Sequence, residues 1–141
     1  MYLKYNAVLR GLQFQVAWPK YEELCKGNKY STTVHAINSA IIKLSKLTTT
    51  GKVYRGVSGG VLPEACRVTN EYGVKGGVEG GFMSTTLNRG TALFYAKGGA
   101  DKSKHGGPAI VFETQMGMVD RGADVSWLSE FQHEAEILFA P

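Results

Sequence analysis

In the first third of the chain, apolar side chains recur at steps of three and four residues, the periodicity of an amphipathic helix. In residues 31–47 they fall on one helical face: Val34, Ile37, Ile41 and Leu44. Ser31 and Thr32 are both candidate N-caps for this helix. A shorter helix is predicted before it, with Pro19 in its first turn and Gly27 at its end. We therefore expect the chain up to about residue 50 to be mainly helical.

Beyond that point the pattern changes to short apolar runs separated by glycine-rich loops. In KVYRGVSGG, strand alternation places Val53 and Arg55 on one face and Tyr54 and Gly56 on the other. The runs GPAIVFETQ and EAEILFA are also predicted strands, because both are apolar and rich in residues that favour β-structure. Since Gly and Pro bound the first of these two runs, we expect it to be a buried strand.

A further short strand, over residues 82–86, is predicted to lead into a helix. This helix is expected to begin near Asn88, which is its candidate N-cap. Leu93 and Phe94 are expected to face the core from it. Strands broken by loops behind a helical front favour an α+β domain over a doubly wound one.

Length and composition fit one domain that spans residues 1–141. About 43% of the residues are apolar, which is enough for a hydrophobic core. We divide the domain into a helical lead-in, residues 1–50, and a β-rich core, residues 51–141.

Charge and cysteine content narrow the function only a little. The formal charge of +4 is compatible with anionic ligands, but no run of basic residues is present, so nucleic acid is not expected as a partner. Cys25 and Cys66 could form a disulfide or stay reduced, which leaves the compartment open. No zinc-type spacing of Cys or His is found, and we expect no metal. No apolar stretch is long enough to span a membrane and no signal peptide is visible in this chain, so we expect a soluble protein. We also expect a monomer.

Two carboxylates, Glu134 and Glu136, stand at the start of the last apolar run. If this segment is a strand, both face one side, while Ala135, Ile137 and Phe139 face the core. Their Cβ atoms would then lie roughly 6–7 Å apart, so that both carboxylates could face one small ligand. The structural alternative is an edge strand that carries charge to prevent aggregation.

Arg55 and the hydroxyls of FMSTT are further candidates. An arginine within an apolar strand is costly unless an anion pairs with it, and its planar fork suits phosphate or carboxylate. Gly56 beside it would let a ligand approach the backbone. Ser84, Thr85 and Thr86 form a row of hydroxyls that could orient a carboxylate. A structural ion pair and a polar strand end are the respective alternatives.

The order of these stretches, VYRG, then GFMSTT, then SEFQHEAEILFAP, resembles the arginine-serine-glutamate class of ADP-ribosyltransferases. This class includes many bacterial toxins and effectors, and eukaryotic ecto-enzymes that modify arginine. The resemblance covers the chain from about Gly51 to Pro141. It implies a helical part packed on a two-sheet β core with a cleft for NAD.

By this resemblance, NAD is the co-substrate, and its nicotinamide–ribose bond is broken through an oxocarbenium-like state. Glu136 is implied to stabilise that state and to bind a ribose hydroxyl, and Ser84 to orient Glu136. Arg55 is implied to hold the NAD phosphates, the backbone of Gly56 to meet the nicotinamide amide, and Thr85 to contact the cofactor.

The resemblance also assigns a role to Glu134. In the family, a glutamate two residues before the catalytic one goes with arginine acceptors, because a carboxylate can grip a guanidinium and favour loss of its proton. Phe131 matches an aromatic of the acceptor-presenting loop, so we expect it to contact a protein substrate. Trp127 in the same loop is expected to pack underneath it.

The leading hypothesis is therefore a mono-ADP-ribosyltransferase that modifies arginine in a protein target. An NAD glycohydrolase on the same scaffold is the alternative, with water as the acceptor. A pseudoenzyme that binds a nucleotide or protein without turnover is a third hypothesis, which the intact stretches disfavour. The sequence does not name the target protein or the compartment.

Overall fold

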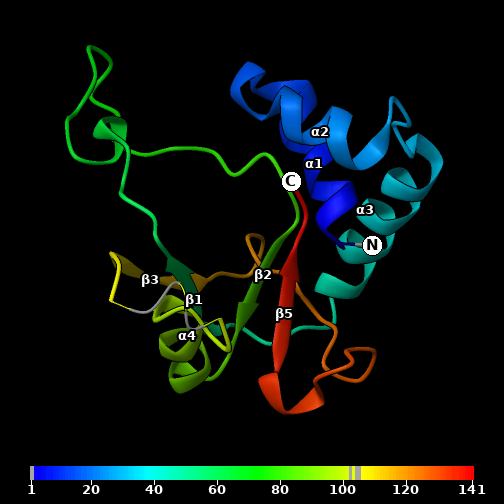
Figure 1. Ribbon diagram of the computed structural model, residues 1–141. Helices are drawn as coiled ribbons and strands as arrows, with labels where there is room; N and C mark the ends of the chain where they lie inside the picture. Colours follow the sequence, from blue (N-terminus) through cyan, green and yellow to red (C-terminus); the bar gives the residue numbers. More distant parts are fainter. Residues whose placement is uncertain (1, 102, 104–105) are drawn as a thin grey trace.

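The computed structural model describes residues 2–101, 103 and 106–141. Helices precede most of the strands, as the α+β expectation requires (Figure 1). The helices are α1 (Tyr2–Gln13), α2 (Trp18–Cys25), α3 (Ser31–Ser45) and α4 (Arg89–Ala96), with 3-10 turns η1 (Gln15–Ala17), η2 (Glu64–Cys66) and η4 (Gln132–Glu134). The strands are β1 (Gly51–Ser58), β2 (Met83–Thr86), β3 (Ala109–Met116), β4 (Ala123–Asp124) and β5 (Glu136–Phe139).

The strands form a five-stranded antiparallel sheet with the order β3-β1-β2-β5-β4. Strands β1 and β3 pair along their whole length, but β1 and β2 are joined only where Tyr54 lies opposite Thr86. Beyond this point the two strands separate (Figure 1). The two-sheet core that we expected is therefore not confirmed; the described strands form one sheet with a narrow junction between β1 and β2.

One face of α1 binds the segment that leads into β2, which does not pair with β1. Four polar side chains of this face contact residues 79–84: Tyr2, Asn6, Arg10 and Gln13. Asn6 is buried and pairs with both backbone groups of Phe82, since its Nδ2 donates to the carbonyl at 3.2 Å and its Oδ1 accepts from the N–H at 2.7 Å. These positions are three or four residues apart and therefore share one side of the helix.

Apolar packing completes the body of the molecule. Ile41 of α3 packs with Phe82 and Ala123, so the N-terminal helices cover the β2-β5-β4 side of the sheet. Helix α4 lies against β1, and a Cβ at Gly56 would come within 1.8 Å of the Ala92 carbonyl oxygen. The absence of a side chain at Gly56 is thus explained by the close approach of a helix.

Several local predictions are confirmed. Helix α2 has Pro19 in its first turn. The Asn88 side chain caps α4, because it accepts hydrogen bonds from the N–H groups of Gly90 and Thr91. Ile137 and Phe139 pack in a core cluster, as strand alternation predicted.

Other local predictions are wrong. Helix α3 has Tyr30 at its N-cap position, in a left-handed conformation, and no side chain caps it; neither Ser31 nor Thr32 does. Phe94 is 52% exposed instead of facing the core. Strand β3 lies at the sheet edge and is largely exposed, because β1 covers only one of its sides. Cys25 and Cys66 are both free thiols, so they do not form the disulfide that the sequence allowed.

Candidate active site

A cavity of about 430 Å³ opens where β1 and β2 separate. Its volume lies in the range of small-molecule sites. Of the residues to which the resemblance assigned a role in binding or catalysis, all but Phe131 line it: Arg55, Gly56, Ser84, Thr85, Glu134 and Glu136. Thr86, from the predicted row of hydroxyls, lines it as well, together with four residues that the sequence did not indicate: Tyr2, Tyr54, Thr91 and Tyr95.

Glu136 is held by Ser84 across the sheet. Strands β2 and β5 pair so that Thr86 lies opposite Glu136 and Ser84 opposite Leu138, which places the serine and the glutamate on one face. The Ser84 hydroxyl donates to Glu136 Oε1 at 2.6 Å. The carboxylate is thereby oriented by a short charge-assisted hydrogen bond.

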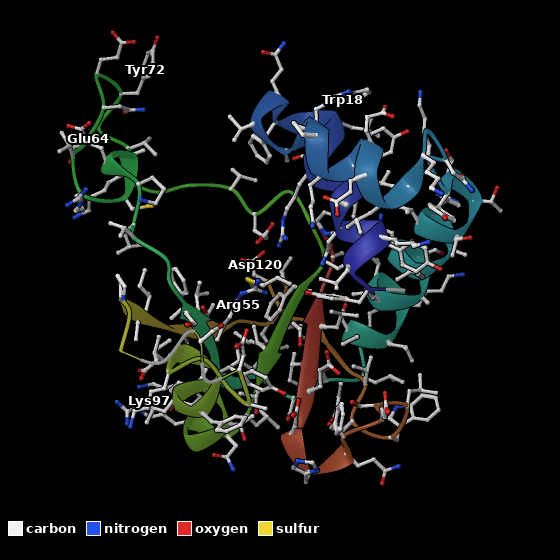
Figure 2. All side chains as sticks on the ribbon, viewed as in Figure 1. Trp18, Arg55, Glu64, Tyr72, Lys97 and Asp120 are labelled. Carbon is white, nitrogen blue, oxygen red and sulfur yellow. The ribbon has the colours of Figure 1, made fainter. Side chains whose placement is uncertain are left out.

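Arg55 belongs to β1, and its side chain lines the cavity between β1 and β2 (Figure 2). Its Nη1 donates to the Ser84 carbonyl of β2 at 3.2 Å. The side chain thus supplies a donor where a paired strand would supply a backbone N–H. Its Nη2 lies 3.9 Å from Glu79 Oε2, which is too long for a hydrogen bond. The Arg55 side chain is 22% exposed. Its guanidinium is therefore fixed in place without a close carboxylate partner among these contacts.

Glu79 is instead neutralised mainly by Arg10, whose Nε and Nη2 each donate to it at 2.9 Å. Burial by itself raises the pKa of Glu79, but the bonds from Arg10 and the Gly81 N–H, with the charges of Arg10 and Arg55, bring the pKa below its usual value. The pKa of Arg10 is raised, chiefly by its hydrogen bond to Glu79. This ion pair connects the segment before β2 to α1. Arg55 lies near it, 3.9 Å from Glu79, but makes no hydrogen bond to that carboxylate.

Thr85 and Thr86 fasten β2 to the end of the chain. The buried Thr85 hydroxyl donates to the Ile137 carbonyl at 2.8 Å, so this hydroxyl proton is already engaged within the sheet. The Thr86 hydroxyl donates to the Glu134 carbonyl and accepts from the Asn88 N–H. The row of hydroxyls thus serves three different acceptors, and Ser84 alone holds a carboxylate directly.

Glu134 reaches the cavity by a route that strand alternation did not predict. It is the last residue of η4, and Ala135 follows it in the left-handed region with φ 47° and ψ 60°. The expectation that both glutamates belong to one strand is therefore wrong, because β5 begins only at Glu136. A 3-10 turn followed by a left-handed residue still directs both carboxylates into one cavity.

Tyr95 of α4 binds the Glu134 carboxylate. Its hydroxyl donates to Glu134 Oε1 at 2.6 Å. This hydrogen bond, with burial and the charges of Glu134 and Glu136, raises the pKa of Tyr95 to about 12. The phenol therefore stays a proton donor throughout the neutral range. No signal in the sequence pattern marks this residue, because an aromatic side chain in an amphipathic helix is ordinary.

The loop that precedes the carboxylates presents aromatic side chains to solvent. Trp127 is 65% exposed, so the expectation that it packs under the loop is wrong. Phe131 is 50% exposed and stacks edge-on with His133, and it does not line the cavity. Its expected contact with a protein substrate stays a prediction.

Within the described part of the chain, no three His, Cys, Asp or Glu side chains are grouped so that they could hold a metal ion. No helix in the same residues is long and apolar enough to cross a membrane.

Comparison with known proteins decides the family. The family model of the ADP-ribosyltransferase exoenzyme matches residues 2–140. The chain belongs to this family. It is thus an ADP-ribosyltransferase that uses NAD as co-substrate, and the arginine-serine-glutamate class is consistent with the match. The family also points to a protein as the substrate. No curated protein and no solved structure matches the chain.

Proposed function

We propose that this ADP-ribosyltransferase is a mono-ADP-ribosyltransferase that modifies arginine side chains of a protein and releases nicotinamide. The observation that carries the proposal is the presence of two carboxylates, Glu136 and Glu134, in one cavity with Arg55. Each has its own hydroxyl donor, Ser84 for the first and Tyr95 for the second. Two separately held carboxylates suit two tasks, one on the ribose and one on the acceptor.

The chemistry of the cavity fits NAD. A guanidinium with unused N–H donors suits the diphosphate, because Arg55 has five N–H donors and gives only one of them to Ser84. The Glu136 carboxylate, oriented by Ser84, suits a ribose that gains positive charge as the nicotinamide departs with the bonding electron pair. A prealigned anion stabilises such a charge without reorganising during the reaction.

Glu134 would then act on the incoming guanidinium. A carboxylate attracts this cation and accepts the proton that a guanidinium nitrogen loses when it bonds to the ribose carbon. Arginine is a poor nucleophile while it is fully protonated, so a nearby base is the main requirement. The Glu134 carboxylate lines the same cavity as Glu136 and meets this requirement.

Two amide substitutions test the proposal with agmatine, a small guanidine, as acceptor and NAD as donor. Glu136→Gln is expected to reduce both transfer and NAD hydrolysis by about 100-fold or more, because the ribose charge loses its partner. Glu134→Gln is expected to lower the ratio of transfer to hydrolysis by at least about tenfold, since only the acceptor needs this base. Mass spectrometry of the products separates ADP-ribosyl-agmatine from free ADP-ribose.

Glu71→Gln is the matched control. Glu71 is exposed on the arm, the connection between β1 and β2 formed by residues 59–82, and it does not line the cavity. It is expected to change neither product. An equal loss of transfer and hydrolysis in Glu134→Gln would refute the acceptor role of Glu134. A wild-type protein that yields only free ADP-ribose would favour an NAD glycohydrolase instead.

A further inference from the structure

Tyr95 stands apart from the stretches that identified the family, yet it binds one of the two carboxylates. Its hydroxyl lies 2.6 Å from Glu134 Oε1, and both residues line the cavity. Thr91, one helical turn earlier on α4, lines the same cavity. Helix α4 therefore forms a wall of the site as well as a packing layer over β1.

The backbone of Glu134 is fixed independently of Tyr95. Its carbonyl accepts from the Thr86 hydroxyl, and its N–H donates to the Phe131 carbonyl at 2.9 Å. These bonds do not fix the Glu134 side chain. Holding it in one rotamer costs conformational entropy. The Tyr95 hydroxyl is the contact that restricts it.

Tyr95 is itself held on a rigid element. Asn88 caps the start of α4, and the following turns approach β1 so closely that a Cβ at Gly56 would meet Ala92 and Ala96. Tyr95 also stacks edge-on with Phe94, with ring centroids 5.4 Å apart. A donor on such a support places its partner more accurately than one on a loop.

We propose that Tyr95 is a positioning residue that determines acceptor specificity, because its hydroxyl holds the Glu134 carboxylate in the orientation that receives a guanidinium. This inference rests on the proposed function and extends it to α4. A phenol is suited to the task, because it donates a hydrogen bond without adding a charge. A lysine or arginine in its place would neutralise the carboxylate that must attract a cation. The raised pKa of Tyr95 keeps the donor protonated at neutral pH.

Tyr95→Phe tests the inference, since it removes the hydroxyl and keeps the ring. The ratio of transfer to agmatine over NAD hydrolysis is expected to fall about tenfold, and the KM for agmatine to rise more than kcat falls, because the carboxylate loses its fixed orientation. Glu134→Gln retains an oxygen that accepts from Tyr95 but lacks the charge. The double variant is therefore expected to lose little more than Glu134→Gln alone, as residues acting through one group are not additive.

Tyr72→Phe is the control, because Tyr72 is 80% exposed on the outlying arm that Figure 2 shows. It is expected to leave both rates and the KM unchanged. If Tyr95→Phe lowers transfer and hydrolysis in parallel, Tyr95 has a structural role only, and the inference is overturned. Unchanged rates would overturn it as well.

A titration separates failure of this inference from failure of the proposed function. In protein labelled at the tyrosine ring carbon that carries the hydroxyl, the Tyr95 resonance is assigned by its loss in Tyr95→Phe. It is expected to titrate near 12 in the wild type and closer to the ordinary value of 10.0 in Glu134→Gln. An unchanged midpoint overturns the contact, whatever the enzyme does. Absence of any transfer to agmatine, with the titration as expected, overturns the acceptor role and with it the proposed function.

Discussion

Ala135 separates the two glutamates and adopts a backbone conformation that residues other than glycine rarely adopt. Its φ of 47° and ψ of 60° place it in the left-handed region. For an alanine this conformation costs about 1–2 kcal/mol, because Cβ approaches the following carbonyl oxygen. Backbone strain of this kind persists where the surroundings impose it. Here the preceding residue, Glu134, is fixed because its carbonyl accepts from the Thr86 hydroxyl and its N–H donates to the Phe131 carbonyl.

Ala135→Gly is expected to relieve this strain. The free energy of unfolding should rise by about 0.5–1 kcal/mol, since part of the gain is offset by the greater freedom of glycine in the unfolded chain. Transfer to agmatine should fall, because the glycine no longer restricts the angle between the two carboxylates. Urea denaturation measures the first effect. A loss of stability in this variant would contradict the strain argument.

At the same scale, the sequence predicted the residues whose chemistry is unusual for their position. Arg55 in an apolar strand and Glu134 beside Glu136 are costly without a ligand, and that cost is visible in the sequence. Tyr95 was not predicted, because an aromatic residue in an amphipathic helix is ordinary and its hydroxyl gains a meaning only when Glu134 is placed beside it. The left-handed conformation of Ala135 was not predicted either, since an alanine does not indicate a turn.

Among the elements, α4 and β1 depend on one position for their contact. Gly56→Ala would place a Cβ 1.8 Å from the Ala92 carbonyl oxygen and 2.6 Å from the Ala96 nitrogen, and both are backbone atoms that cannot turn aside. The helix must move, at a cost of about 1–3 kcal/mol or more. Transfer should fall with it, because α4 carries Tyr95 to Glu134.

Gly51→Ala is the control for this substitution. Gly51 begins the same strand, and a Cβ there would meet nothing within 4 Å. Thermal unfolding and transfer assays of the two variants are to be compared under identical conditions. Equal effects of the two substitutions would show that the requirement is for glycine flexibility in β1 and not for space under α4.

The periodicity of the sequence predicted most elements but not their environment. The helices at α2, α3 and α4 and the strands at β1, β2, β3 and β5 follow from apolar spacing and from turn residues. Burial of β3 was predicted wrongly, because an apolar run does not reveal whether a strand has one neighbour or two. The two residues of β4 are too few to form a pattern.

Across the whole molecule, we infer that the helical lead-in helps to form the cavity, because Tyr2 of α1 lines it. An ordinary sheet would continue β1 along β2 and fill the gap with backbone. Here α1 binds the residues before and within β2 through polar side chains, so β1 is free to diverge and the cavity opens between the strands. Periodicity could not reveal this, because these side chains bind the backbone of a segment distant in sequence, which leads into β2.

Asn6→Ala tests this dependence. Asn6 is 2% exposed, and its loss would leave the buried Phe82 N–H without its partner and remove one of two donors to the Phe82 carbonyl. An unpaired buried backbone group costs about 1–3 kcal/mol, so the free energy of unfolding should fall by that amount. The KM for NAD should rise as well, because Phe82 leads directly into β2, where Ser84 follows two residues later. Asn28→Ala, which removes an exposed bond to the Tyr30 N–H, is the control. A variant that loses stability but binds NAD normally would show that α1 supports the fold without shaping the cavity.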